Sequence, residues 1–543
     1  MDFKAEIIKL LKKEIKEEIN LEIPHDNILG DYAFPCFSLA KTFKKNPNEI
    51  ASELSKKIKA DFLEKVENKG PYVNFFIDKK SFCEVVLKDI LKNKYFEKRK
   101  KGKVLIEHTS INPNASPHVG RARNAVIGDS LKRLFEFLGY KVETHYYVND
   151  VSKQIAMMTL NCTGKEKFSD LLKKYQEISK KIEENPELEK EVFNVLNKFE
   201  KGDKKTNLKI KKIVDIAVDG QKKILSEFGI KFDYFDYESK YLKESTNALK
   251  ELEKTGKLFT DEEGRKVLDQ RGTGLEKNMK NAVLVLTRND GTGLYPLRDI
   301  AYTLDKMKKA ENNIIVLGEY QKLYFLHFKE DVKLLKKKAP DVAHYSFVLI
   351  QGKEGPTKMS TRKGDVVLFE DFMKEAREKA SKEILERKTK GSPEIIGYGA
   401  VKYAIIKNDP NKNILFKMEE ALSFDGDTGP YLQYSYARAS SILRKSKKKP
   451  GLNFKIKNID ETIKLVKILS EFPRIIEHAE EQRDPSLVAK FSFQLAQSFN
   501  ELYHHTTVIG SAQEDFLVSL TAAFKEVLKK SLNILGIETL EEM

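Results

Sequence analysis

The spacing of apolar residues changes within residues 104–148, and each change predicts a different element. Residues 104–108 form a short apolar run, which predicts a buried strand. Apolar residues then recur at helical spacing from 126 to 138 and stop at Gly139, a residue typical of helix C-caps. Residues 142–148 predict a second strand. This succession of strand, loop, helix and strand predicts the first βαβ unit of a doubly wound nucleotide-binding domain.

The pattern that precedes this unit predicts a separate α/β module. Residues 3–19 carry one apolar helical face, with Lys and Glu on the opposite face. Turn signals followed by strand-like residues occur at 30–35 and 70–77, and residues 48–58 predict a helix that follows Pro47.

The C-terminal part of the chain is expected to be all-helical. From residue 424 onward the pattern contains no strand signal, and long apolar stripes with short Gly or Pro breaks predict a helix bundle. The expected helices cover residues 431–443, 463–472, 487–503 and 517–535.

We therefore expect a multidomain α/β protein. Its parts are an N-terminal α/β module at residues 1–98, a Rossmann-like doubly wound catalytic domain at 99–372, and an all-α helix bundle with its connecting stem at 373–543. A Lys/Glu-rich helical insertion without chemical motifs is expected within the catalytic domain at about 164–219.

Composition narrows the function less than the pattern does. The net charge of +16 and the pI of about 9.2 favour a polyanionic partner, although a surface covered generally by lysine gives the same balance. Cys36, Cys83 and Cys162 are far apart, so neither a structural zinc site nor a disulfide framework is expected. No run approaches 18 apolar residues and no signal peptide opens the chain, which favours a cytoplasmic protein without a membrane partner.

The loop of the βαβ unit carries the first candidate chemistry. His118 and Gly120 fall where the loop becomes a helix, and the backbone N–H groups of a helix N-terminus suit a phosphate. Gly120 lets a base or ribose approach the backbone, and His118 can donate a hydrogen bond to a phosphate as charge builds on it. A loop histidine that only caps a helix is the structural alternative.

A second group of polar residues suggests a pocket for a cationic side chain. Asn149, with Asp150 and Gln154, follows a strand, and ligands of open α/β sheets lie beyond the carboxyl ends of strands. Further along lie an aromatic strand ending in Glu238, the pair Tyr295 and Asp299 four residues apart, and a buried strand leading to Gln321. Two carboxylates, a phenol and an amide together suit a guanidinium, although each residue singly has an ordinary structural explanation.

The segment Pro117-His118-Val119-Gly120-Arg121 resembles the His-x-Gly-His motif of class I aminoacyl-tRNA synthetases. Lys358-Met-Ser-Thr-Arg-Lys-Gly364 resembles their second motif, and it lies about 240 residues downstream in the right order. The resemblance implies ATP binding and catalysis by residues of both motifs. These are His118, Gly120, Arg121, Asn124, Lys358, Met359, Ser360, Arg362 and Lys363.

Across the whole chain the closest resemblance is to arginyl-tRNA synthetases, of an archaeal-like type. The residues that match that family's arginine-binding positions are Ser110, Asn112, Glu238, Tyr295, Asp299 and Gln321. The residues that match its tRNA contacts are Tyr72 and Asn74 in the N-terminal module, which touches the tRNA elbow (D-loop) in that family, and Tyr431, Tyr434, Arg438 and Met543 in the helical anticodon-binding domain. Tyr and Arg side chains on one helical face suit splayed single-stranded bases, although core packing explains either Tyr alone.

The resemblance implies a ligase, arginine--tRNA ligase (EC 6.1.1.19), that uses ATP carried with Mg²⁺, L-arginine and the tRNA for arginine, without zinc and as a monomer. Two departures are noted: Arg121 stands where many class I members have His, and Ala115 stands where many arginyl enzymes have Lys. The competing hypotheses are a catalytically inactive tRNA-binding paralogue, a small-metabolite nucleotidyltransferase and a synthetase for cysteine. The last would normally bring zinc-ligand cysteines.

Overall fold

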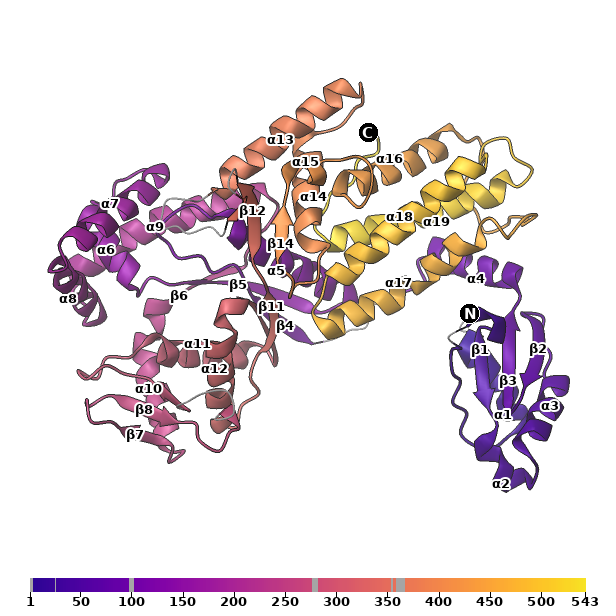
Figure 1. Cartoon of the computed structure of the whole chain (residues 1–543), viewed down its shortest axis with the longest axis horizontal. Helices are drawn as coiled ribbons and strands as arrows, with labels where there is room; N and C mark the ends of the chain where they lie inside the picture. Colours follow the sequence, from indigo (N-terminus) through magenta and orange to yellow (C-terminus); the bar gives the residue numbers. More distant parts are fainter. Residues whose placement is uncertain (1–2, 25, 97–101, 276–281, 353–354, 358–366) are drawn as a thin grey trace. The chain divides into compact units, whose positions relative to one another are not determined.

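The computed structural model describes residues 3–543 except 25, 97–101, 276–281, 353–354 and 358–366 (Figure 1). The chain forms two compact units. The first contains residues 1–97, 438–473 and 494–528, and the second contains residues 98–437, 474–493 and 529–543.

The second unit is built on a parallel five-stranded sheet. Its strands follow the order β11-β10-β4-β5-β6, and every neighbouring pair is parallel. Their bounds are β4 (Lys103–Glu107), β5 (Lys141–Val148), β6 (Tyr234–Tyr237), β10 (Asn312–Gly318) and β11 (Asp341–Tyr345). The chain moves from β4 to one side through β5 and β6, and β10 lies on the other side of β4. The order therefore reverses at β4, which is where open α/β sheets bind ligands.

The connection from β4 to β5 is α5 (Val119–Leu138), which confirms the βαβ unit expected from the sequence. The helix buries an apolar face that includes Val126, Leu131 and Leu134. It ends at Gly139, whose φ of 100° lies in the left-handed region that favours glycine.

The segment between β5 and β6 is helical, as the Lys/Glu-rich pattern indicated. It contains α6 (Lys153–Asn161), α7 (Leu171–Glu184), α8 (Leu188–Glu200) and α9 (Lys204–Glu227). Apolar residues at helical spacing give α7 a buried stripe of Leu171, Tyr175 and Ile178.

Two small sheets in this unit were not predicted. One is antiparallel, with β7 (Leu258–Thr260), β8 (Lys266–Asp269) and β9 (Val283–Val285). The other joins β12 (Val348–Gly352), β13 (Gly355–Thr357) and β14 (Ile414–Phe416). Strands of three to five residues are too short to show a periodicity.

The helices from α10 to α15 also belong to this unit. They are α10 (Leu242–Glu253), α11 (Tyr295–Lys309), α12 (Lys322–Leu334), α13 (Phe369–Glu386), α14 (Pro393–Ile406) and α15 (Met418–Ala421). The start of α11 at Tyr295 places Tyr295 and Asp299 on one helical face, as the sequence spacing predicted.

The first unit contains the expected N-terminal α/β module. Its antiparallel sheet has the order β1-β3-β2. The elements are α1 (Phe3–Glu14), β1 (Tyr32–Pro35), α2 (Ala40–Phe43), α3 (Pro47–Lys57), β2 (Leu63–Lys69), β3 (Tyr72–Ile77) and α4 (Lys79–Leu91). Asn46 caps α3 by accepting from the backbone N–H of Asn48 at 2.9 Å.

The module is not isolated within its unit, because it contacts the helical segment that follows residue 438. Lys79 forms an ion pair with Asp460 at 2.8 Å, and the rings of Tyr95 and Phe472 lie 5.8 Å apart. The module therefore packs against other parts of the chain within its unit.

The described residues from 424 to the end contain helices and no strand, which confirms the all-helical expectation. The helices are α16 (Gly429–Lys445), α17 (Ile463–Gln482), α18 (Ser486–His505) and α19 (Glu514–Ile534), and their residues belong partly to each unit. The expected end of the second helix at residue 472 is wrong, because α17 continues through Pro473 to Gln482. Among the described residues, no helix has the length and apolar character needed to cross a membrane.

Candidate functional site

A cavity of about 410 Å³ lies at the carboxyl ends of β4, β5 and β10 and beside α11 and α12. The sequence-predicted residues that line it are Ser110, Asn112, Arg121, Asn124, Asn149, Glu238, Tyr295, Asp299 and Gln321. The structure thus brings together residues spread over about 210 positions, including all six expected at an arginine site. His118 and Gly120 are not among the residues that line this cavity.

The most distinctive group in the cavity is the carboxylate of Asp299. Burial raises the pKa of this group to about 6, and a hydrogen bond of 2.6 Å from the Tyr324 hydroxyl opposes that rise. Among the described residues it has no ion-pair partner. A buried carboxylate with a raised pKa and no ion pair favours binding of a positively charged ligand.

Two other acceptor atoms in the cavity have no hydrogen-bond partner among the described residues. They are the Oε2 atom of Glu238 and the Oδ1 atom of Asn149, and both are buried. Unsatisfied buried acceptors are costly, so they indicate a place that a ligand with several N–H donors would complete.

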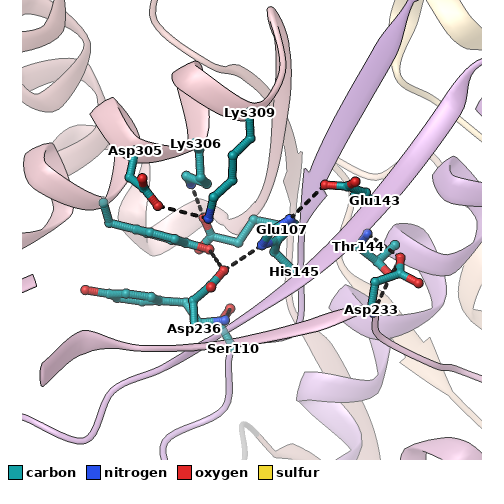
Figure 2. A network of polar contacts seen from close by, with 12 residues as sticks. Glu107, Ser110, Glu143, Thr144, His145, Asp233, Asp236, Asp305, Lys306 and Lys309 are labelled. Carbon is teal, nitrogen blue, oxygen red and sulfur yellow. Dashed lines mark hydrogen bonds and ion pairs between the residues drawn. The ribbon is translucent and has the colours of Figure 1, made fainter. Parts of the chain in front are cut away.

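Two further carboxylates in the cavity are already paired with cations of the protein. Arg298 donates from Nε to Oε1 of Glu238 at 2.5 Å and from Nη1 to the carbonyl of Gly293. Burial raises the pKa of Glu238, and the Arg298 guanidinium opposes that rise. On the same helix Lys306 pairs with Glu107, as Figure 2 shows.

Further polar contacts join residues of β5, β6 and α11 next to the cavity. His145 Nδ1 and Asp236 Oδ2 lie 2.5 Å apart (Figure 2). The Tyr302 hydroxyl donates to the same carboxylate oxygen at 2.9 Å. The ring of Tyr302 stacks on that of Tyr147 with centroids 4.5 Å apart. These contacts, none of which the sequence predicted, fix the aromatic wall of the cavity.

The loop after β4 has an unusual backbone at the expected amino-acid site. Thr109 and Ser110 have φ values of 73° and 43°, which are strained for residues other than glycine. Asn124 accepts from the Thr109 N–H at 2.5 Å, and the Tyr147 N–H donates to Ser110 Oγ at 3.1 Å. Because the other end of the Asn124 amide donates to the Val316 carbonyl at 2.9 Å, this side chain is used to hold the loop.

The next part of that loop is braced from the helical insertion. Gln221 of α9 donates to the carbonyls of Asn112 and Ala115 at 3.0 and 2.9 Å. Asn112 in turn donates to Gln154 at 2.8 Å. Gln221 gave no sequence signal, because a glutamine in a Lys-rich helix normally faces solvent.

Asp150 was expected in the same pocket, and this expectation is wrong. It lines a separate cavity of about 670 Å³ between the helical insertion and α10. Its Oδ1 accepts from the backbone N–H of Ser239 at 2.9 Å, so it holds the segment that follows Glu238.

His118 is the N-cap residue of α5. Burial lowers its pKa to about 4, and the charge of Arg121 acts in the same direction, so the imidazole is neutral near pH 7. Its buried Nδ1 atom has no partner among the described residues. A neutral imidazole with a free nitrogen at a helix N-terminus suits an anionic ligand that accepts a hydrogen bond.

The segment after the second motif is attached to this same loop. The Phe369 N–H donates to the Pro117 carbonyl at 2.8 Å, and the Val119 N–H donates to Val367 at 3.2 Å. The motif residues expected to act in catalysis, namely Lys358, Met359, Ser360, Arg362 and Lys363, lie outside the described residues.

Arg121 faces the cavity side of α5 and not its solvent side. Its Nη1 donates to the Tyr320 hydroxyl at 2.7 Å, and the residue lines the cavity. The acidic residue further along the same helix, Asp129, accepts from Arg133 at 2.7 Å and not from Arg121.

The residues expected to meet tRNA differ in accessibility. Tyr72 is half-buried with its ring at an edge contact to Phe37, but Asn74 is only 4% exposed, so its side chain has little surface for an RNA contact. Three successive residues of the central strand β3 are buried, so side chains on both of its faces are covered there, which the sequence of a short strand does not show.

On α16, Tyr431, Tyr434 and Arg438 are each half-buried and share one helical face. Arg438 donates to Asn500 Oδ1 at 2.6 Å and lies 4.9 Å from the Tyr503 ring centre. Met543 is half-buried beyond the last helix.

Comparisons with known proteins agree over the whole length. Family models match for the catalytic domain of class I (R) tRNA synthetases at residues 84–418, the DALR anticodon binding domain at 432–543 and the arginyl tRNA synthetase N-terminal domain at 2–77. The arginine--tRNA ligase of Methanocaldococcus jannaschii is 37% identical, with 99% of each chain covered, and that of Halothermothrix orenii is 36% identical, with 100% of each covered. The structure of Thermus thermophilus arginyl-tRNA synthetase superposes with a TM-score of 0.80 at 26% identity, over 100% of both chains. The chain belongs to the arginyl-tRNA synthetase family of class I aminoacyl-tRNA synthetases.

Proposed function

We propose that this chain is an arginine--tRNA ligase that activates L-arginine with ATP and transfers it to the 3′ end of its tRNA. The observation that supports the substrate most directly is the cavity with Asp299. Its carboxylate has no cationic partner among the described residues, and unused acceptors of Glu238 and Asn149 lie in the same cavity. A guanidinium carries one positive charge and five N–H donors, so it matches both features.

In this proposal the substrate guanidinium forms its charged hydrogen bonds with Asp299. Glu238 accepts through its unused Oε2 atom, and Tyr295 at the cavity mouth packs against the methylenes. Ser110, Asn112 and Gln321 bind the α-amino and carboxyl groups. The hydrogen bonds around residues 109–112 keep this part of the site in place before the substrate arrives.

The arginine carboxylate then attacks the α-phosphorus of ATP in line, the bond from that phosphorus to the bridging oxygen breaks, and pyrophosphate leaves. Negative charge grows on the phosphate oxygens, so fixed donors there lower the barrier. His118 donates from its neutral imidazole, Gly120 leaves room for the nucleotide beside the helix N-terminus, and Arg121 adds a permanent charge. By family resemblance Asn124 belongs to the ATP site, and Lys358, Met359, Ser360, Arg362 and Lys363 complete the phosphate site.

Binding of tRNA is proposed for two separate surfaces. Tyr72 belongs to the elbow-binding module, and Tyr431, Tyr434, Arg438 and Met543 belong to the anticodon-binding region. The net charge of +16 supports a polyanionic partner whose binding weakens as salt rises. The corresponding domains are residues 1–98, 99–372 and 373–543.

By family resemblance we further propose a cytoplasmic monomer that needs Mg²⁺ with its ATP and no zinc. The proposal of no zinc rests on the spacing of Cys36, Cys83 and Cys162, which are free, buried and far apart in the sequence. The alternative of an inactive paralogue predicts a degraded pocket, whereas all six expected arginine-site residues line one cavity here.

The decisive experiment is arginine-dependent ATP–pyrophosphate exchange followed by charging of the tRNA for arginine. Lysine and citrulline serve as controls, because lysine has a different cation and citrulline has the shape without the charge. Charging with arginine alone is the expected result. Absence of charging by a folded protein that binds tRNA would favour the inactive paralogue.

A further inference from the structure

The wall of the cavity contains a lysine whose role is not explained by substrate binding. Lys306 lies on α11, its side chain is 1% exposed, and it lines the cavity. Lysine is almost never fully buried unless it is paired. Here it pairs with Glu107, and its Nζ lies 4.1 Å from the centre of the Tyr302 ring. A buried ammonium beside the site for a cationic substrate calls for an explanation, because like charges repel.

Residues of α11 line the cavity from its mouth to its buried end. Five residues of the helix line the cavity, and besides Thr303 they follow one another turn by turn: Tyr295, Asp299, Tyr302 and Lys306. Exposure falls along this row, from 54% at Tyr295 to 2% at Tyr302 and 1% at Lys306. Tyr295 therefore stands at the mouth, Asp299 lies between, and Lys306 is at the closed end.

The three carboxylates of the cavity differ in whether a cation of the protein is paired with them. Glu107, Glu238 and Asp299 are the carboxylates at its wall, and the first two are paired with Lys306 and Arg298. Of these three carboxylates, only Asp299 forms no ion pair with a described residue. Lys306 thus removes Glu107 as a free acceptor and puts a positive charge beyond the position where Asp299 would hold a guanidinium.

We propose that Lys306 is a specificity-determining residue, a fixed cation that closes the buried end of the pocket and rejects guanidino acids longer than arginine. A side chain with one more methylene would push its guanidinium from Asp299 towards the ammonium of Lys306. It would find no free carboxylate there, because Glu107 is already paired. Arginine itself stops at Asp299 and avoids the repulsion. The inference rests on the proposed function and adds the residue that limits substrate length.

The test compares arginine with homoarginine, its homologue with one more methylene, in pyrophosphate exchange with saturating tRNA. Lys306→Met keeps much of the volume and removes the charge, leaving Glu107 able to accept a guanidinium. We expect the ratio of kcat/KM for homoarginine to that for arginine to rise at least tenfold. In Lys306→Arg the cation is retained, so the ratio should stay at or below the parent value.

Lys309 offers a matched control one turn further along α11. It pairs with Asp305 at 2.9 Å, its side chain is 36% exposed, and it does not line the cavity (Figure 2). Lys309→Met should leave the ratio unchanged. Lys306→Gln is the second variant if Lys306→Met does not fold, since an amide can still donate to Glu107 while the charge is gone; the ratio should rise there as well.

A merely structural lysine would lower both rates in parallel, so an unchanged ratio in a folded Lys306→Met or Lys306→Gln overturns the proposal. A rise of the same size in Lys306→Arg also overturns it, because shape and not charge would then set the limit. These outcomes differ from failure of the proposed function, in which the parent enzyme itself would show no arginine-dependent exchange.

Discussion

Replacing Asp299 with asparagine tests the substrate site most directly. The change keeps the shape of the side chain and removes its charge, and one side-chain atom remains to accept from Tyr324, which donates to Asp299 at 2.6 Å in the parent. Asp299 has no ion-pair partner among the described residues, so no protein cation is left unpaired by the substitution. The variant should therefore fold normally, and its defect should appear only with the cationic substrate.

The expected size follows from the lost interaction. A hydrogen bond between charged groups contributes about 1.5–3 kcal/mol, so kcat/KM for arginine should fall roughly 10- to 150-fold. The KM for ATP should change little, because Asp299 lies in the cavity at the carboxyl ends of the strands and not at the N-terminus of α5. The parent should not activate citrulline. The variant should prefer arginine over citrulline less strongly than the parent does.

The pH dependence gives a second readout of the same residue. The carboxyl of Asp299 must be ionised to bind the guanidinium, and burial raises its pKa to about 6. In the parent, arginine affinity should be constant above about pH 7 and fall as the pH drops through 6. This decline should be missing in Asp299→Asn.

Steady-state exchange measured between pH 5.5 and 8 with varied arginine and saturating ATP provides both readouts. Two results would refute the reasoning: arginine kinetics of Asp299→Asn equal to those of the parent, or an acid limb that survives the substitution. Either would remove Asp299 from the guanidinium site.

Three further predictions concern ATP and tRNA. Pyrophosphate exchange should depend on tRNA, as the family resemblance and the Ala at position 115 suggest; robust exchange with arginine alone would contradict this. Arg121→Ala should slow single-turnover adenylate formation tenfold or more, about 1.4 kcal/mol, whereas Arg121→His should retain appreciable activity with a fall on the alkaline side; an alanine variant as fast as the parent would show that Arg121 does not act on the phosphates. Tyr72→Ala should raise the KM for tRNA about tenfold, the loss of one stacked base, and leave arginine-dependent exchange at saturating tRNA unchanged. Equal charging kinetics at low tRNA would exclude Tyr72 from the RNA contact.

The sequence by itself determined the features that depend on local spacing. The βαβ unit around α5, its end at Gly139 and the helical C-terminal region all follow from the period of apolar residues. The same argument placed Tyr295 and Asp299 on one face, because residues four apart on a helix are neighbours. The chemical types of the polar residues, together with family resemblance, identified the acceptors suited to a guanidinium.

Only the tertiary structure decided how the charges are paired. Glu107 and Lys306 are 199 residues apart, and Glu238 and Arg298 are 60 apart, so no local pattern relates them. They meet because the strand order brings the ends of β4 and β6 beside α11. The same dependence on packing explains why Asn74 is buried and why α17 continues through Pro473. It also explains why Gln221 supports the loop after β4. Residue type determined which groups can bind a cation, and the fold determined which of them are already occupied by a cation of the protein.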